Sequence, residues 1–237
     1  NLYIYKMKIL ITRSFDQSRR FSERLVKKFD NKLDISISPI IKIKPLYLNV
    51  ELNSFDGIIF TSENAIKVCK KIDISSDKKI FCVGRQTKKM AEKNGLKVSN
   101  TGKDTASLIK LLLTIKIKTR LLYLCGKNIS VDLSKAFSSS DTVSVCTKAI
   151  YDQTPLKLTL NAINILSQKK PVLVPIFSER SGHILSRQFT KKMTSPRIAL
   201  CFSKQIANSL VNYEYDKVLI SPYPDIENLI ALIEEFI

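Results

Sequence analysis

The stretch GIIFTSENAI, residues 57–66, places an apolar run directly before a cluster of short polar side chains. The polar residues of this cluster are Thr61, Ser62, Glu63 and Asn64. The same order recurs in VLVPIFSERSGHIL, residues 172–185, where Ser178 begins the polar cluster. An apolar strand that passes through a polar turn into a helix is the unit from which parallel sheets are built. These two stretches therefore predict a parallel α/β fold.

Strand patterns and helix patterns alternate along the rest of the chain. In the first two thirds, the predicted strands are 8–12, 33–38, 56–62, 79–84, 120–126 and 142–151, and the predicted helices are 14–29, 63–71 and 85–95. In the last third, the predicted strands are 171–178, 197–203 and 216–224, and the predicted helices are 179–189, 204–212 and 225–236. This alternation is typical of sheets with helices on both faces.

The distribution of these elements suggests two domains, one of them discontinuous. We expect residues 7–38 and 155–237 to form the first domain and residues 47–146 to form the second. The connecting segments 39–46 and 147–154 alternate apolar and polar residues and are flanked or interrupted by proline, as extended chain often is. We therefore predict an α/β protein with two flavodoxin-like doubly wound parallel-sheet domains joined by a two-stranded hinge, with a cleft between the lobes.

Composition places the chain among ordinary globular proteins. Its 237 residues are 44% hydrophobic and 25% charged, and no apolar run approaches the roughly 20 residues that a membrane span needs. The leader NLYIYK lacks the apolar core of a signal peptide, so we expect translation to start naturally at Met7 and the protein to stay in the cytoplasm.

Cysteine and histidine are too sparse and too scattered to suggest a metal site. The five cysteines are odd in number and show no CxxC spacing, which favours buried thiols in a reducing cytosol. His183 is the only histidine, and without a GxSxG motif nearby it is expected to be a solvent-facing helical residue. No GxGxxG or GxxxxGK[ST] motif is present, so nucleotide binding loses its usual sequence support.

The net charge of +18 predicts a field that attracts anions. Two interpretations stay open: a lysine-rich solvated surface, or attraction of a particular anionic partner. Aromatic residues make up 8% of the chain and are not interleaved with the basic residues, so nucleic acid is not expected as a partner.

The polar turns after residues 57–60 and 172–177 have two competing explanations. In open parallel sheets the ligand crevice lies at the carboxyl ends of the strands, where hydroxyl groups and free helix-start amides can bind an anion. The alternative is that the short polar residues only cap the following helices. Both explanations fit the sequence.

A family resemblance covers nearly the whole chain from Met7. It is carried, in order, by the segments KILITR, DGIIFTSENAIKV, IFCVGRQTKKMAEKNGLKV, LLYLCG, AIYDQTP, the SERS turn and SPYPDIENLIALI. Together these segments resemble uroporphyrinogen-III synthase. The resemblance implies a two-domain enzyme of tetrapyrrole synthesis that cyclises hydroxymethylbilane to uroporphyrinogen III, with loss of water and inversion of ring D.

The resemblance also implies what the enzyme binds. It implies no cofactor and no metal, and a polycarboxylate tetrapyrrole as ligand. We also expect no membrane partner, a monomer, and transfer of the substrate from hydroxymethylbilane synthase. The alternative from another class is a non-catalytic two-lobed binder of anionic ligands or RNA.

By position in the family motifs, Tyr151 is the implied catalytic residue, near the leaving hydroxyl. The implied substrate-binding residues are Arg13, Thr61, Ser62, Asn64, Ala65, Gly84, Thr87, Ser178, Arg180 and Ser181. In CFSKQIA, residues 201–207, the sequence departs from relatives that carry a glycine and a threonine, and we expect Ser203 and Gln205 to take their place.

Overall fold

The computed structural model describes residues 6–47, 50–70 and 72–237. Its strands are β1 (Met7–Ile11), β2 (Leu33–Ile37), β3 (Ile41–Pro45), β4 (Gly57–Phe60), β5 (Lys79–Val83), β6 (Val98–Gly102), β7 (Thr119–Gly126), β8 (Val143–Pro155), β9 (Val172–Ile176), β10 (Arg197–Cys201) and β11 (Lys217–Ile220). Its α-helices are α1 (Phe15–Phe29), α2 (Glu63–Cys69), α3 (Arg85–Lys93), α4 (Thr105–Leu112), α5 (Leu133–Ala136), α6 (Leu160–Leu166), α7 (Glu179–Ser186), α8 (Lys204–Ser209) and α9 (Ile226–Glu234). Most of the expected leader, 1–5, and the last residue of the predicted helix 63–71 lie outside the described residues.

The chain divides into two compact units, of which the first comprises residues 1–42 and 155–237. Its sheet has the strand order β11-β10-β9-β1-β2, and all of these strands are parallel. Numbered within the unit this is the 2-1-3-4-5 order of flavodoxin-like sheets. The prediction of a doubly wound parallel sheet is confirmed here.

The second unit comprises residues 43–154 and contains the sheet β3-β8-β7-β4-β5-β6. Its strands β4 to β8 are parallel and follow the order 3-2-1-4-5, the other common doubly wound arrangement. The two sheets are therefore both doubly wound, but they differ in strand order.

β3 and β8 are neighbours and contain both points where the chain passes between the units. The Leu46 amide donates to the Ile150 carbonyl at 2.8 Å, and the Leu156 amide donates to the Ile40 carbonyl at 2.8 Å. These two bonds show that the segments run antiparallel. That the pair acts as a hinge stays a prediction.

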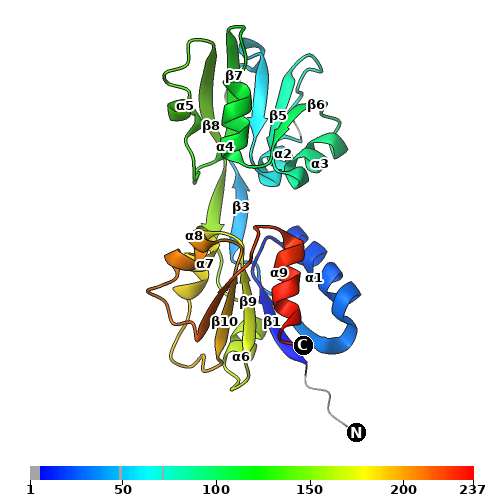
Figure 1. Ribbon diagram of the computed structural model, residues 1–237, viewed down its shortest axis with the longest axis vertical. Helices are drawn as coiled ribbons and strands as arrows, with labels where there is room; N and C mark the ends of the chain where they lie inside the picture. The colour runs from blue at the N-terminus through cyan, green and yellow to red at the C-terminus, as the bar shows by residue number, and fades with distance from the viewer. Residues whose placement is uncertain (1–5, 48–49, 71) are drawn as a thin grey trace. The chain divides into compact units, whose positions relative to one another are not determined.

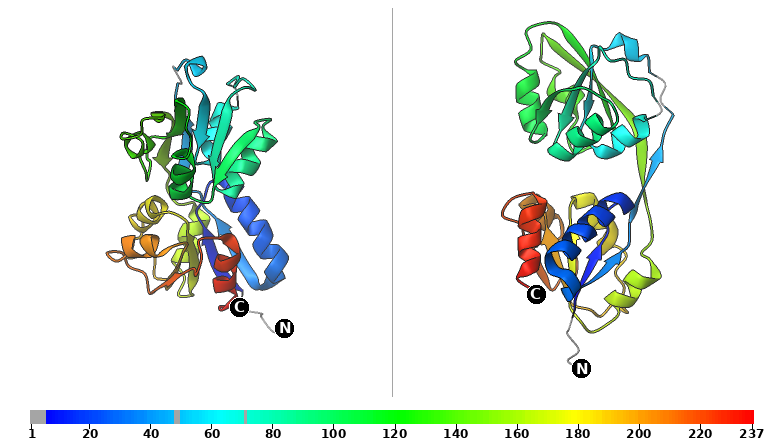
Figure 2. Two further views of the ribbon diagram at one scale, coloured as in Figure 1. Left: turned by 45° about the horizontal axis from the view of Figure 1, so that its top comes forward. Right: turned by 90° about the vertical axis from the view of Figure 1, so that its right-hand side faces the viewer.

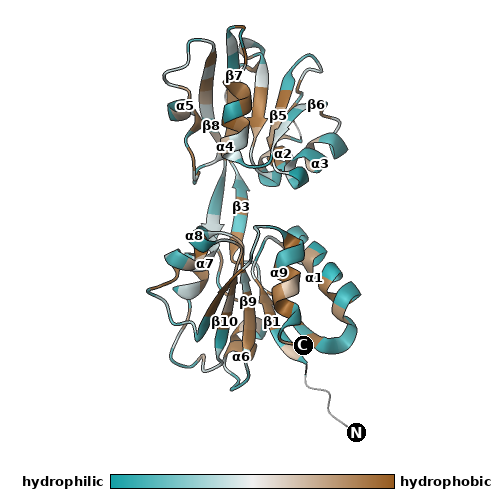
Figure 3. Cartoon of the chain, viewed as in Figure 1, coloured by the Kyte–Doolittle hydropathy of each residue, from teal (hydrophilic) through white to brown (hydrophobic). Residues whose placement is uncertain are grey.

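Each sheet is covered by helices on both faces within its own unit, as Figures 1 and 2 show. In the first unit, α1 and α9 pack on one face through residues such as Leu25 and Leu229, and α6, α7 and α8 pack on the other. In the second unit, α2 and α3 share one core, and α4 and α5 share the other. In Figure 3 the strands β9 and β10 are mainly apolar, whereas α3 is mostly polar.

Short polar side chains fix the starts of several helices, as their sequence positions predict. The hydroxyl groups of Ser62, Ser178 and Ser203 accept from the Asn64, Ser181 and Ile206 amides. The Asp225 carboxylate accepts from the Asn228 amide at the start of α9. Each of these bonds satisfies an amide that has no partner inside its helix.

Several features differ from the expectations. β6, α4, α5 and α6 are not among the predicted elements; β6 has the mostly polar sequence VSNTG, which gives little strand signal. Cys146 on β8 is exposed, whereas the other four cysteines are buried as expected. His183 is partly buried rather than solvent-facing: its Nε2 lies 3.1 Å from the Ser209 carbonyl oxygen and its ring packs on Tyr213.

The neighbouring residues Leu25 and Val26 on α1 test how the first core is held. Leu25 is fully buried, whereas Val26 is 52% exposed. We expect Leu25→Ala to lower the free energy of unfolding by about 2–5 kcal/mol, because it leaves a cavity, and Val26→Ala by less than about 0.5 kcal/mol. Urea unfolding followed by circular dichroism measures both, and equal losses would contradict this packing.

Candidate functional site

Both sheets have a topological switch point, where the chain leaves neighbouring strands in opposite directions. In the first unit it lies between β1 and β9, and in the second between β4 and β7. Ligands of doubly wound folds bind outside the carboxyl ends of the strands at such points. Arg13 follows β1, Ser178 follows β9, and Thr61 follows β4. The fold therefore places predicted site residues from both units at these positions.

In the second unit, Ser62 lies beside the phenol of Tyr151. The Ser62 hydroxyl accepts from the Asn64 amide at 3.1 Å. Burial raises the pKa of the Tyr151 phenol, and the neighbouring Ser62 hydroxyl and Gly126 backbone lower it. These two neighbours therefore favour the phenolate form and assist loss of the phenol proton.

The ring of Tyr151 lies over Gly126, which leaves no room for a side chain there. A Cβ atom at Gly126 would lie 2.6 Å from Cε2 of Tyr151 and 2.7 Å from its Cζ. Gly126 is also the neighbour of Tyr151 in the register of β7 and β8. Glycine at this position is therefore what allows the phenol to reach Ser62.

Thr61 is held by a second tyrosine, Tyr123 of β7, whose phenol oxygen lies 2.9 Å from Thr61 Oγ1. Tyr123 belongs to the core that contains α4 and α5, whereas Tyr151 belongs to the core that contains α2 and α3. Successive side chains of extended backbone point to opposite faces of a sheet. Thr61 and Ser62 thus each meet the tyrosine of their own face.

Burial keeps both phenols protonated at neutral pH. Desolvation raises the pKa of Tyr123 to about 12, and the hydrogen bond with Thr61 acts in the opposite direction. Desolvation likewise raises the pKa of Tyr151, against the hydrogen bonds from Ser62 and Gly126. Each phenol can therefore serve as a proton or hydrogen-bond donor.

The other predicted residues of the second unit lie in the same turns. Asn64 is partly buried in the first turn of α2, and the side chain of Ala65 is fully buried in the core. Gly84 begins α3 with φ 82°, a conformation that favours glycine, and Thr87 is buried on α3. The turn at Gly84 follows β5 and therefore lies one strand away from the switch point.

In the first unit, Arg13 stacks on an aromatic cluster. Its guanidinium carbon lies 4.1 Å from the centroid of the Phe177 ring, at the end of β9. Phe177 in turn contacts Phe21 and Phe202, with ring centroids 5.5 Å and 5.3 Å apart. The stacking holds the cation beside the switch point.

The polar residues after β9 and β10 mainly organise the helix starts. Ser178 Oγ lies 2.8 Å from Ser181 Oγ, and Arg180 is partly buried in the same turn. Ser203 caps α8, and Gln205 donates to Glu179 Oε1 at 2.6 Å, which ties α8 to α7.

The capping explanation of the two polar turns is correct for their serine residues, since Ser62 and Ser178 both cap a helix. In addition, Glu63 and Glu179 lie in the first turns of α2 and α7 and place negative charge at the positive helix ends. These carboxylates compete with any anion that approaches the same amides. Helix-start amides alone are thus a weaker basis for anion binding than the sequence suggests.

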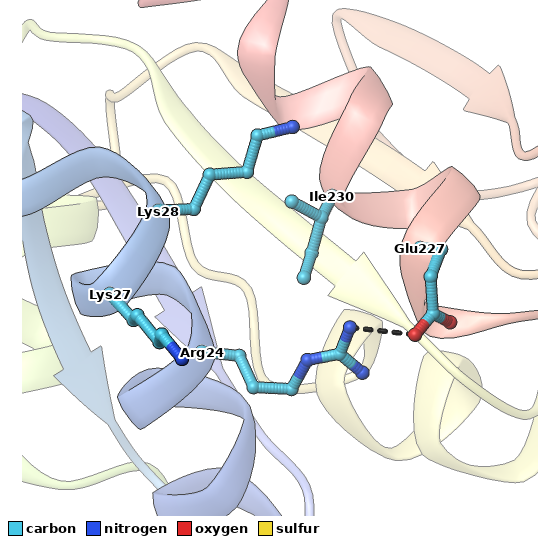
Figure 4. Close-up of a pocket in the computed structure, with 5 residues that line it drawn as sticks. All are labelled: Arg24, Lys27, Lys28, Glu227 and Ile230. Atoms are coloured by element: carbon cyan, nitrogen blue, oxygen red, sulfur yellow. Dashed lines mark hydrogen bonds and ion pairs between the residues drawn. The ribbon is translucent and has the colours of Figure 1, made fainter.

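A groove of about 530 Å³ lies elsewhere, between α1 and α9, and is lined by Arg24, Lys27, Lys28, Glu227 and Ile230 (Figure 4). Its Arg24 is paired with Glu227 at 2.7 Å, and Lys28 with Glu234 at 2.6 Å. The groove contains none of the predicted site residues.

No group of three or more His, Cys, Asp or Glu side chains is placed to hold a metal ion within residues 6–47, 50–70 and 72–237. Over the same parts of the chain, none of the helices combines the length and apolar character that crossing a membrane requires.

Comparison with known proteins identifies the family. A family model described as uroporphyrinogen-III synthase HemD matches residues 24–231. The chain therefore belongs to the uroporphyrinogen-III synthase family, whose members are enzymes of tetrapyrrole biosynthesis. A search of curated protein sequences finds no match for it.

Solved structures support the fold. The crystal structure of uroporphyrinogen-III synthetase from Helicobacter pylori is similar to this chain with a TM-score of 0.68 at 16% identity, covering 98% of this chain and 100% of that one. A mutant uroporphyrinogen III synthase from the extremely thermophilic bacterium Thermus thermophilus is similar with a TM-score of 0.51 at 12% identity, covering 97% of each chain.

Sequence reasoning missed several residues of this arrangement. Tyr123 lies in the apolar run of β7 and has the sequence pattern of a core residue, since its partner Thr61 is 62 positions away. Gly126 and Phe177 likewise gain their meaning only from contacts across the sheet. Tyr123 and Gly126 lie in the LLYLCG segment of the family resemblance, but that segment does not show which residues they contact.

We predict that the protein loses stability in alkaline solution. Burial raises the pKa of Cys82 from 9.0 to about 12 and that of Tyr123 from 10.0 to about 12. Folded-state pKa values above the unfolded ones give stability that is complete below about pH 9 and is lost as the pH rises toward about 12. Urea unfolding under reducing conditions should show this decline, and Tyr123→Phe should make it less steep. A free energy of unfolding that stays constant between about pH 9 and pH 12 would contradict the raised pKa values of these buried groups.

We also predict that Gly126→Ala is destabilising, because the new Cβ overlaps the Tyr151 ring. The expected cost is about 1–3 kcal/mol, as for other overpacked sites. As a control, Gly182→Ala meets Leu210 Cδ2 at 2.9 Å, the end of a flexible side chain, and should cost less. A double-mutant cycle with Tyr151→Ala checks the cause: if the two changes are additive, the clash is elsewhere.

Proposed function

We propose that this protein cyclises hydroxymethylbilane to uroporphyrinogen III, with inversion of ring D and loss of water, and is therefore a cyclising hydro-lyase. The observation that carries the proposal is the family match over residues 24–231. The placement of Arg13, Thr61 and Tyr151 near the switch points adds support, because ligands of doubly wound folds bind at such points. The alternative of a non-catalytic anion or RNA binder is not favoured, because the family consists of enzymes.

The substrate is a flexible chain of four pyrroles with carboxylates along its edges, and the protein offers matching groups. Arg13 supplies a stacked cation that can pair with a carboxylate and contact a pyrrole face through its aromatic neighbours. The turn residues Asn64 and Arg180 supply further donors at the carboxyl ends of the strands. The net charge of +18 favours encounter with a polyanion. We propose that residues of both units take part in binding the substrate.

We assign the departure of the hydroxyl group to Tyr151. As the bond between the methylene carbon and the hydroxyl oxygen breaks, the pyrrole nitrogen supplies electrons and an azafulvene cation forms. The Tyr151 phenol gives its proton to the departing oxygen, so that water leaves, and the Ser62 and Gly126 donors stabilise the phenolate. Ring D attacks the cation through its substituted carbon to give a spiro intermediate.

The spiro intermediate then fragments and recloses with ring D inverted, and the pyrrole carbon that has gained the new bond loses a proton. That proton can return to the Tyr151 phenolate, so the net change is loss of one water. None of these steps oxidises or reduces the substrate. Holding a flexible chain in the reactive conformation can lower the barrier by about 7–11 kcal/mol in favourable cases, and we expect most of the rate to arise there.

The setting of the reaction is also part of the proposal. The five cysteines are free and four are buried, which supports a reducing compartment such as the cytoplasm. We propose a monomer that receives hydroxymethylbilane directly from hydroxymethylbilane synthase, since the substrate cyclises spontaneously to the type I isomer when free.

The test of the function is incubation with enzymatically prepared hydroxymethylbilane, followed by oxidation and separation of the porphyrin isomers. The type III isomer is expected. Formation of type I alone by the folded protein would overturn the proposal.

The test of the assigned acid is Tyr151→Phe, which removes one hydroxyl group and keeps the ring. We expect turnover to fall by about 10- to 10³-fold without disappearing, because the positioning contribution remains. Tyr215→Phe is the matched control: it also removes a buried phenol, which lies 2.9 Å from Ser186 Oγ in the first unit. Wild-type turnover in Tyr151→Phe would show that the departing oxygen takes its proton elsewhere.

A further inference from the structure

Thr61 and Ser62 are consecutive residues that lie beside two tyrosines from opposite faces of the second sheet, and Tyr123 is hydrogen-bonded to Thr61. We propose that Tyr123 is a positioning residue for the cyclisation: by holding Thr61, it fixes the turn in which Ser62 contacts the Tyr151 phenol. The inference rests on the proposed function and adds to it a residue that acts through two others.

Tyr123 is well suited to fix a turn because it is buried in the middle of the sheet. It lies inside β7, where the register pairs it with Ile59 of β4 on one side and Thr147 of β8 on the other. Only 4% of its surface is exposed. The position of its phenol, and hence of the hydrogen bond to Thr61, is therefore determined by the sheet.

Thr61 is the first residue after β4, and Ser62 has extended backbone angles, φ −149° and ψ 138°. The direction of the Ser62 hydroxyl is therefore set by the backbone at Thr61. The same hydroxyl accepts from the Asn64 amide and lies beside the Tyr151 phenol, so a small rotation would disturb both contacts. A catalytic group needs this kind of support from its surroundings to stay in its reactive geometry.

The first unit contains a similar pair that lacks this connection. The hydroxyl oxygens of Tyr215 and Ser186 also lie 2.9 Å apart. Ser186 is the last residue of α7, however, and its side chain is buried. Neither residue is next to a predicted catalytic group. A variant of this pair therefore shows how much activity is lost when any buried hydroxyl hydrogen bond is removed. Any larger loss in the Tyr123 variant then reflects the turn at Thr61.

The experiment compares Tyr123→Phe and Tyr215→Phe by steady-state kinetics with hydroxymethylbilane and by the ratio of type III to type I product. We expect kcat to fall about three- to tenfold in Tyr123→Phe with KM unchanged, the range for loss of one neutral hydrogen bond. In Tyr215→Phe we expect kcat to stay at the wild-type value. Thr61→Ser, which keeps the oxygen, should lose less kcat than Thr61→Val.

Double variants decide whether Tyr123 acts through the turn. In a Thr61→Val or Tyr151→Phe background, Tyr123→Phe should lower kcat no further, since the bond or the group it serves is already absent. If the effects instead multiply, or if kcat is unchanged in Tyr123→Phe while the wild type makes type III, the inference is overturned. Failure of the wild type to make type III would overturn the proposed function itself, and the two results are thus distinguishable.

Discussion

The parallel hydrogen bonding of β4 with β7 and of β1 with β9 is the constraint on which the arrangement of functional residues depends. Parallel strands all have their carboxyl ends on the same side of a sheet, so the residues that follow the strands lie on that side. Because helices cover both faces of each sheet, polar side chains can stay hydrated or hydrogen-bonded mainly at these strand ends. The packing of the cores thus determines where functional side chains can lie, and the residues of the turns determine which functional groups lie there.

The turn after β4 is constrained by hydrogen bonds to the Thr61 and Ser62 hydroxyl groups. Two tyrosines from different cores hold neighbouring hydroxyl groups, and one of them lies on a glycine whose missing side chain makes room for it. Buried hydroxyl groups of this kind need partners, and here each partner is another member of the same network. The same contacts therefore stabilise the second unit and orient the phenol of Tyr151.

The proposed recognition of an anionic substrate combines a diffuse and a local contribution. The excess of basic residues is spread along the sequence and acts mainly on encounter, whereas Arg13 is held in place by stacking on Phe177. Glutamates in the first turns of α2 and α7 weaken the helix ends as anion sites. The second of the two interpretations of the charge, a particular anionic partner, gains support from the family.

The sequence by itself determined the doubly wound sheets, the helix starts at Ser62, Ser178 and Asp225, and the family, because strand and cap signals depend on neighbouring residues. It did not reveal β6, whose polar residues lack a strand pattern, nor the packing of His183 on Tyr213. Only the tertiary structure decided the strand order of each sheet and the pairing of Tyr123 with Thr61. Such contacts join residues far apart in the chain, and their energy depends on the folded register rather than on any local pattern.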